Sequence, residues 1–455
     1  MKKFNTTLSL LFLSVSITST VAVAKVSPEK AAQLGTNLTI LGAEVAGNKA
    51  GTIPEWQGGL TSKNTTKSKD PGRPDNPFPE DKPLFVIDNA NLDQYKSNLS
   101  PGQIAMFERY ADYKMPIYKT RRTNAYPESL SKTIKSNATS TELINGGNGV
   151  TNFSTTIPFP IPQNGAEAIW NHITRYRGGS AKRFITVMPV QKDGTFTTIK
   201  TNDQLVWPSF LVGGSDAEKD NNILFYYMQQ ITAPARLTGT ALLVHETLDQ
   251  VTEPRKAWVY NSGQRRVRRA PNVAYDSPGA GTDGLRGMDN YDMFNGAVDR
   301  YNWKLVGKKE LYIPYNSYKL LDTTAKYEDI VKEGHLNSDF LRYELHRVWQ
   351  VEAVLKENAR HIYAKRTFFI DEDSWTAGVI DQYDGRGKLW KLSEGHTVQF
   401  YDVDSSWLAA ETLHDLNSGR YLATGLSNEE PKFMDWGFKA KRKDFGTSAL
   451  RRSGR

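Results

Sequence analysis

The chain of 455 residues contains no cysteine. This absence excludes disulfide bonds, thiol chemistry and cysteine-ligated metal centres. Long hydrophobic runs are also missing after residue 24, so no later segment is predicted to cross a bilayer. A chain of this length does not depend on covalent cross-links for stability. Hydrophobic residues at 38% and aromatic residues at 11% are sufficient to build a core.

The usual catalytic signatures are missing as well. The sequence has no Gly-x-Ser-x-Gly elbow, no phosphate-binding glycine loop and no His-Glu-x-x-His motif. The seven histidines form no pair at the spacing of a zinc site; they are His172, His245, His335, His346, His361, His396 and His414. We therefore predict no catalytic residue, no metal and no cofactor.

The first 24 residues have the pattern of an export signal. Lys2 and Lys3 precede an apolar stretch at residues 8–15, and Ala22-Val23-Ala24 is a small-x-small cleavage site. The apolar stretch is too short, and too rich in Ser and Thr, to span about 30 Å of hydrocarbon. We expect cleavage after Ala24, and no lipid attachment because no cysteine follows.

Positive charge exceeds negative charge, with a formal net charge of +8 at pH 7. The most basic cluster comprises Arg265, Arg266, Arg268 and Arg269. In an exported protein the available anions are lipid head groups, lipopolysaccharide or an acidic protein, so we expect no nucleic-acid partner. The cluster indicates either peripheral membrane contact or simply a solvated strand end.

Three regions follow from the composition along the chain: a signal peptide at 1–24, a helical and extended region at 25–150 that wraps the body, and a β body at 151–455. A short helical segment is predicted within 25–46 and a second within 93–113, starting near Ser100-Pro101. The clearest helix is 165–176, where Ala166, Ile169, Trp170 and Ile173 share one face.

From residue 184 onward the hydrophobic pattern has period two, which is typical of strands. Candidate strands are 184–191, 195–200, 223–232, 237–247, 257–261, 266–269, 303–312, 342–355, 362–371, 376–383, 389–400 and 406–415. Residues 261–263 and 384–387 are tight turns between them. The predicted fold class is α+β, mainly β: a large curved antiparallel sheet with helices packed on it. The helices are too few to cover all these strands, which leaves room for a ligand.

Several long motifs resemble a known proteobacterial family. They are Gly35-x-x-Leu38-Thr39-x-x-Gly42-Ala43-Glu44, Gly51-Thr52-Ile53-Pro54-Glu55-Trp56, Pro158-Phe159-Pro160-Ile161-Pro162, Glu167-Ala168-Ile169-Trp170-Asn171-His172-x-x-Arg175-Tyr176-Arg177-Gly178, Ala257-Trp258-Val259-Tyr260, Asn302-Trp303-Lys304-Leu305-Val306-Gly307 and Arg342-Tyr343-Glu344-Leu345-His346-Arg347-Val348-Trp349. Together they resemble the family called domain of unknown function 1329 (DUF1329), over essentially the whole mature chain.

This resemblance implies a LolA/LolB-like fold, an open half-barrel of antiparallel strands that carries acyl chains on its concave side. It also implies a periplasmic location, with an inner-membrane transporter of the resistance-nodulation-division (RND) class and an outer-membrane protein as partners. The implied function is binding and shuttling of a lipid or other hydrophobic molecule between the two membranes, without enzymatic activity.

Two groups of candidate ligand-binding residues follow. The candidate liners of the concave face are Phe225, Tyr227, Leu243, Trp258, Tyr260, Trp349 and Phe369; ordinary core packing is the alternative for each. His172, Arg175 and Tyr176 lie within one helical turn and are placed to hold a lipid head group. A salt-bridge clamp between helix and sheet is the alternative for these three.

Carboxylates near aromatic residues leave a rival function open. Asp371-Glu372-Asp373 and Asp381-x-x-Asp384 provide the side chains of a glycoside hydrolase or of a polysaccharide-binding groove. Their positions at predicted hairpin ends favour solvated turn residues instead. A structural envelope adaptor with a completely filled sheet is the third alternative.

Overall fold

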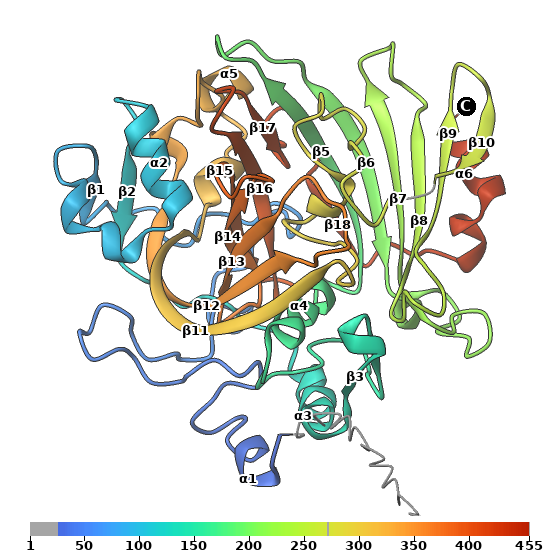
Figure 1. Cartoon of the computed structure of the whole chain (residues 1–455), viewed down its shortest axis with the longest axis horizontal. Coiled ribbons are helices and arrows are strands. Elements are labelled where there is room, and N and C mark those ends of the chain that lie inside the picture. Colours follow the sequence, from blue (N-terminus) through green and yellow to red (C-terminus); the bar gives the residue numbers. More distant parts are fainter. Residues whose placement is uncertain (1–25, 271–272, 455) are drawn as a thin grey trace, which may run out of the picture.

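A single curved sheet of 16 strands organises the protein (Figure 1). The computed structural model describes residues 26–270 and 273–454, so the predicted signal peptide lies outside the described residues. The sheet has two free ends and its strands are antiparallel neighbours, except that β2 and β12 run parallel. The predicted fold class, a mainly β, curved antiparallel sheet carrying a few helices, is therefore confirmed.

The strand order shows a meander with insertions. It is β1 (Phe85–Ile87), β2 (Met115–Tyr118), β12 (Tyr343–Leu355), β13 (Lys365–Asp371), β14 (Ala377–Tyr383), β15 (Leu389–Phe400), β16 (Ser405–Asp415), β17 (Tyr421–Thr424), β5 (Ser180–Val190), β6 (Ile199–Val206), β7 (Ile223–Ala233), β8 (Ala241–Thr247), β9 (Lys256–Asn261) and β10 (Arg266–Arg269). In addition, β11 (Tyr301–Pro314) pairs with β12 and β18 (Met434–Trp436) pairs with β5. A separate hairpin joins β3 (Glu142–Ile144) and β4 (Gly149–Thr151).

Most of the predicted strands are present near their predicted positions, but the strand predicted at 195–200 is wrong. Thr195 belongs to a turn in which the carboxylate of Asp193 accepts hydrogen bonds from both its amide and its hydroxyl group. The strand β6 starts only at Ile199. The sequence also predicts no strand before residue 184, whereas β1 and β2 extend the sheet from within the N-terminal region.

The helices cover limited parts of the sheet. The predicted long helix is α4 (Gly165–Thr174), which packs against β11 and β12, and α2 (Pro101–Arg109) packs against β14 and β15. The remaining helices are α1 (Pro28–Ala31), α3 (Ser131–Ser140), α5 (Tyr327–Ile330) and α6 (Thr447–Ser453). Helix α6 covers β8, β9 and β10 near the end of the sheet (Figure 1). Within the described ranges, no helix combines the length and apolarity needed to cross a bilayer.

The two halves of the sheet differ in how their concave face is covered. Along the half formed by β11–β17, the concave face is packed with buried residues such as Trp170, Phe294, Phe368 and Trp375. At the β7–β9 end, a second small core lies on the opposite face, beneath α6. The concave face at this end is covered only by residues 273–295, which contain a single 3₁₀ turn and no strand.

Candidate functional site

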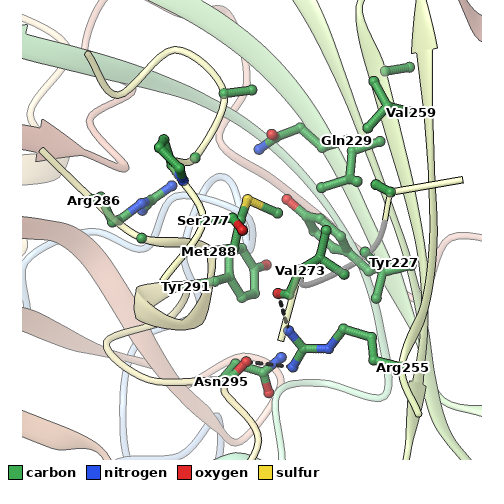
Figure 2. Close-up of a pocket in the computed structure, with 18 of the residues that line it drawn as sticks. Tyr227, Gln229, Arg255, Val259, Val273, Ser277, Arg286, Met288, Tyr291 and Asn295 are labelled. Atoms are coloured by element: carbon green, nitrogen blue, oxygen red, sulfur yellow. Dashed lines mark hydrogen bonds between the residues drawn. The ribbon is translucent and has the colours of Figure 1, made fainter. Parts of the chain in front are cut away.

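A cavity of about 300 Å³ lies between the concave face of β7–β9 and residues 273–295, called here the closing segment (Figure 2). The strand β7 contributes alternate residues, because successive side chains of a strand point to opposite faces. On β7 these are Phe225, Tyr227, Gln229 and Ile231. The cavity is thus enclosed by a regular sheet on one side and by irregular backbone on the other.

Most of the lining is apolar. Leu242 and Val244 of β8 and Val259 of β9 continue the surface begun on β7, and their register places them side by side. The closing segment adds Val273 and Met288 from the other side (Figure 2). Such a surface favours the hydrocarbon part of a ligand, because each square ångström removed from water contributes about 25 cal/mol.

The cavity has a buried end and an open end. At the buried end, Phe225 is 1% exposed and Tyr227 is 5% exposed. At the open end, Pro278 and Ala280 are exposed residues of the lining. The amide of Gly279 donates a hydrogen bond to the carbonyl of Arg286 at 2.9 Å, which places Arg286 at the open end as well.

Arg255 fastens the closing segment to the sheet. Its guanidinium forms an ion pair with Glu246 of β8 and donates hydrogen bonds to the carbonyls of Val273 and Asn295 (Figure 2). The side-chain amide of Asn295 also donates to Glu246 at 2.8 Å. One buried ion pair therefore holds both ends of the closing segment.

Of the seven candidate liners, Phe225 and Tyr227 lie on the cavity wall. Leu243, Trp258 and Tyr260 do not: they lie on the opposite face of the same strands, packed in the core beneath α6. The physical reason is the strand alternation, which turns Leu243 away from the side that Leu242 and Val244 face.

The other two candidate liners lie far along the sheet from the cavity. Phe369 of β13 is a core residue with 2% exposure. Trp349 of β12 is half-buried, stacks on Trp375 with ring centroids 6.2 Å apart, and has the ammonium of Lys308 4.9 Å above its ring. Neither residue lines the cavity of Figure 2.

His172 and Arg175 belong to a buried network around Asp292. The Asp292 carboxylate pairs with Arg175 at 2.7 Å and with Arg177, while its carbonyl lies 3.1 Å from Nε2 of His172. Burial, with the charge of Arg175, lowers the pKa of His172 to about 3. Because Asp292 belongs to the closing segment, these ion pairs join the end of α4 to that segment, and the indole of Trp407 on β16 also donates to Asp292 at 2.9 Å. The site is therefore a buried clamp and not an open head-group site.

Tyr176 lines a small cavity together with Arg175 but forms no hydrogen bond with Asp292 in the described structure. Its ring is half-buried, with its centroid 6.5 Å from that of Phe210. Burial raises the pKa of its hydroxyl group to about 12. Tyr176 is thus more exposed than His172 and Arg175, which are both buried.

The acidic triplet 371–373 is buried, so the prediction that these residues are solvated turn residues is wrong. Asp371, Glu372 and Asp373 are 1%, 2% and 3% exposed. Arg122 donates to both oxygens of Asp373, at 2.6 and 3.0 Å, and Arg347 pairs with Glu372. These arginines come from distant parts of the sequence and neutralise the carboxylates, which is why burial is tolerated.

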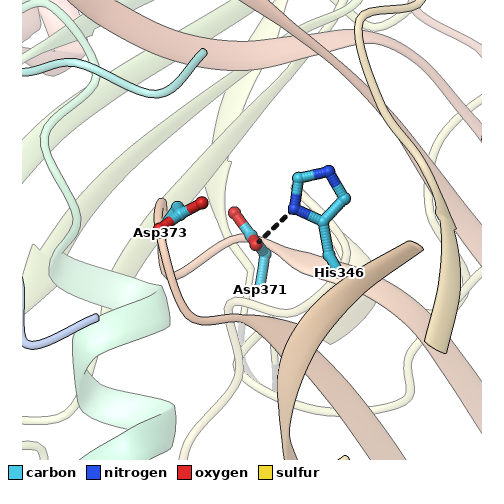
Figure 3. Close-up of side chains that lie close together, drawn as sticks. All are labelled: His346, Asp371 and Asp373. Carbon is cyan, nitrogen blue, oxygen red and sulfur yellow. Dashed lines mark ion pairs between the residues drawn. The ribbon is translucent and has the colours of Figure 1, made fainter. Parts of the chain in front are cut away.

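His346, Asp371 and Asp373 also have the composition of a metal-binding cluster (Figure 3), with one ligand atom of each residue within 4.8 Å of the others. The donors do not fit a resident cation. Both oxygens of Asp373 already accept from Arg122, and one oxygen of Asp371 accepts from the hydroxyl of Ser374 at 2.6 Å. The arginine takes the place that a cation would fill, so the cluster serves as an internal ion-pair network.

The carboxylates of Asp381 and Glu394 form a second buried acidic site, beneath the start of α2. Asp381 accepts hydrogen bonds from the hydroxyl of Ser100 and the amide of Gly102, and Glu394 accepts from Gln103. Burial raises the pKa of Asp381 and of Glu394 to about 7 each. Asp381 is therefore not a solvated turn residue, and this prediction is also wrong.

Asp384 does lie in a turn. Its carboxylate accepts hydrogen bonds from the amides of Arg386 and Lys388, at 2.9 Å each.

The predicted basic cluster is part of a larger exposed surface, to which residues from the end of the chain also contribute. Helix α6 packs against β10, and together they carry an arginine face, defined as Arg265, Arg266, Arg268, Arg269, Arg451 and Arg452. All six are exposed, and none of their guanidinium groups forms an ion pair or hydrogen bond with another residue of the described ranges.

Sequence reasoning missed the closing segment as part of the site. The strands predicted from the sequence lie on either side of residues 273–295, and no role in binding is predicted for these residues. The one available signal was the break in period-two alternation between β10 and β11, together with Gly279, Gly281, Gly284 and Gly287. Which strands this segment covers depends on long-range packing, and no local pattern encodes that.

Comparison with known proteins finds relatives over nearly the whole chain. The family described as "Protein of unknown function (DUF1329)" matches residues 86–451. PA3922, an uncharacterized protein of Pseudomonas aeruginosa, is 55% identical over 444 residues, which are 97% of each chain.

Two solved structures are also similar. A DUF1329 family protein of Desulfovibrio piger is 15% identical, with a TM-score of 0.41 over 60% of this chain and 92% of that one. The LolA superfamily protein NE2245 of Nitrosomonas europaea is 11% identical, with a TM-score of 0.38 over 63% of this chain and 100% of that one. The match across residues 86–451 and the 55% identity to PA3922 confirm the resemblance seen in the motifs: the chain belongs to the DUF1329 family.

Proposed function

We propose that this protein is a non-enzymatic carrier that binds a lipid or another hydrophobic molecule in the cavity between β7–β9 and the closing segment. The observation that carries the proposal is the apolar lining of this cavity, formed by Phe225, Leu242, Val244 and Val259 among others. Its volume of about 300 Å³ is at the small end of the range for ligand sites, about 300–1,000 Å³. A single hydrocarbon chain suits this size better than a whole multi-chain lipid.

The energetics of transfer support the same function. Each buried methylene of an acyl chain contributes about 0.8 kcal/mol. A carrier must supply much of this contact and still release the ligand. The cavity offers a regular sheet as a fixed wall and the closing segment as the opposite wall. Arg255 holds the two ends of that segment, and Asp289 and Asp292 within it pair with Arg366 and with Arg175 and Arg177. Ligand entry is therefore expected at the exposed end near Pro278 and Ala280.

The rival functions have less support. A glycoside hydrolase needs two accessible carboxylates beside the substrate, but Asp371, Asp373 and Asp381 are buried, hydrogen-bonded and absent from the cavity wall. A structural adaptor needs a filled concave face, and the cavity leaves part of that face unfilled. The carrier is therefore the function that the geometry favours.

We place the carrier in the periplasm, moving its ligand between the inner and outer membranes. The support is the signal-like sequence at 1–24 and the family resemblance. The same resemblance names an RND-class transporter and an outer-membrane protein as partners. N-terminal sequencing of the exported chain should begin at Lys25, and in-cell crosslinking followed by identification of the captured chains tests the partners.

A carrier must also approach membranes, and the arginine face is suited to this. Six unpaired guanidinium groups favour an anionic lipid surface, with a contribution of about 1 kcal/mol for each residue near the surface. Vesicles containing phosphatidylglycerol should bind the protein, and 0.5 M salt should release it. Replacing Arg266 and Arg268 by Gln should weaken binding, whereas replacing Lys132 and Lys135 of α3 should not. Equal weakening by both pairs contradicts a specific role for this face.

Native mass spectrometry of the protein purified from the periplasm tests the carrier function. We expect a bound hydrophobic molecule that is lost in Val259→Trp, because the indole would fill the cavity from β9. Thr232→Trp is the matched control, since Thr232 is an exposed residue on the opposite face of β7. A wild-type chain that is always empty, and that binds no added hydrophobic ligand, contradicts the proposal.

A further inference from the structure

We infer that the ligand of this cavity is a single-chain amphiphile with an anionic head, such as a carboxylate, and that Arg286 binds the head at the open end. This inference rests on the proposed function and specifies its ligand class. It follows from three observations: the polarity of the cavity ends, the unpaired state of Arg286, and the pairing of the other buried arginines.

The cavity has a direction. Its buried end is formed by Phe225, Tyr227 and Val273, and its exposed end by Pro278 and Ala280. An amphiphile enters such a site with its hydrocarbon chain towards the buried end, because that end removes more apolar surface from water. Its head then remains at the exposed end, where water and polar groups are available.

Arg286 lies at that exposed end. Its side chain extends from the closing segment towards the cavity, on the side opposite Arg255 (Figure 2). Its backbone carbonyl accepts hydrogen bonds from Gly279 and Thr282, but its guanidinium forms no ion pair or hydrogen bond with another described residue. The charge of Arg286 acts to lower the pKa of the buried Glu411 carboxylate, against the larger effect of burial, which raises it. The two groups do not approach within 4.0 Å, the limit of an ion pair. The five donors of this guanidinium are therefore available to a ligand.

The other cationic groups near the cavity are already paired. Arg255 binds Glu246 and two carbonyls, and Arg183 binds Asp203 at 2.9 Å together with the hydroxyl of Tyr291. Among the arginines of the cavity wall, Arg286 is the one without a carboxylate in the described structure. A guanidinium matches a carboxylate in geometry and charge, so Arg286 should bind an anionic head more tightly than a hydroxyl group.

The test compares two ligands that differ only in the head. Dodecanoic acid and 1-dodecanol are titrated at pH 8, below their aggregation limits, by displacement of a fluorescent hydrophobic probe. The wild-type protein should bind the ionised acid about tenfold more tightly than the alcohol, the factor expected from a charge-assisted hydrogen bond at a partly exposed site. Arg286→Gln should abolish this preference by weakening binding of the acid to about the level of the alcohol, and circular dichroism verifies that the variant is folded.

Matched variants separate Arg286 from general charge effects. Arg266→Gln removes the same charge from the arginine face and should retain the preference, and Arg286→Lys should retain part of it. Equal binding of acid and alcohol by the wild type, or an unchanged preference in Arg286→Gln, would overturn the inference while leaving hydrophobic binding intact. Failure of the wild type to bind either ligand would overturn the proposed function itself.

Discussion

Two consecutive leucines of β8 should respond to mutation in opposite ways, because they face opposite sides of the sheet. Leu242 is half-buried on the cavity wall, whereas Leu243 is 0% exposed in the core beneath α6. Leu243→Ala removes a completely buried side chain, which lowers the free energy of unfolding by about 2–5 kcal/mol. Leu242→Ala should lower it by about half as much, since the wild-type side chain is already partly in contact with solvent.

The effect on binding should be reversed. Leu242→Ala removes contact surface from the ligand site, so its affinity for dodecanol should fall about four- to fifteenfold, for one to two lost methylene contacts of about 0.8 kcal/mol each. Leu243→Ala should bind with wild-type affinity at temperatures where it remains folded. Urea unfolding gives the first quantity and probe displacement gives the second.

The same pair of variants can refute the position of the site. A large loss of affinity in Leu243→Ala, with wild-type affinity in Leu242→Ala, would place the ligand beneath α6 and not beneath the closing segment. A loss of stability smaller than about 1 kcal/mol in Leu243→Ala would contradict the packing of that side chain.

Three further predictions concern the buried charges. Asp292→Asn should lower the free energy of unfolding by about 3–5 kcal/mol, because Arg175 and Arg177 lose their shared carboxylate; a urea titration checks this. Gly102→Ala should destabilise, although alanine usually favours a helix, because its Cβ would lie 2.3 Å from the Asp381 carboxylate; thermal unfolding at pH 7 checks the sign. Asp381→Asn should gain about 3 kcal/mol relative to wild type between pH 5 and pH 8, since burial raises the pKa of Asp381 to about 7 and the folded wild type becomes charged only above that pH; unfolding curves with parallel pH dependence would contradict this.

The long strands could be predicted from the sequence because their pattern is local. The strand β15 was predicted at 389–400 and β10 at 266–269, which are their observed bounds. The strand β18 has only three residues, and β17 is buried at all four positions, so neither shows the alternation of a period of two. Their place beside β5 is determined by contacts across the whole chain.

The candidate site was predictable only in part. Period-two alternation indicates that Leu242 and Leu243 face different sides, but not which side is concave. The pattern therefore could not show whether Leu243, Trp258 and Tyr260 face the cavity. The structure places them beneath α6, on the other side of the sheet. Arg286 could not be predicted as a binding residue, because only the folded chain shows that its guanidinium is unpaired.

The buried acidic triplet has a similar explanation. Asp373 is neutralised by Arg122, which lies 251 residues away in the sequence. The local sequence shows three carboxylates at the end of a strand without a nearby cation, a pattern that predicts exposure to solvent. Only the assembled sheet brings such charges together, so neither the burial of the triplet nor its ion pairs could be read from local sequence.

A crystal structure of the protein with dodecanoate tests the central claim most directly, that the cavity beneath the closing segment is the ligand site. We expect the hydrocarbon chain beside Phe225 and Leu242, with the carboxylate within hydrogen-bonding distance of Arg286. A ligand bound beneath α6 or elsewhere on the sheet, with the cavity closed by the protein's own side chains, would contradict it.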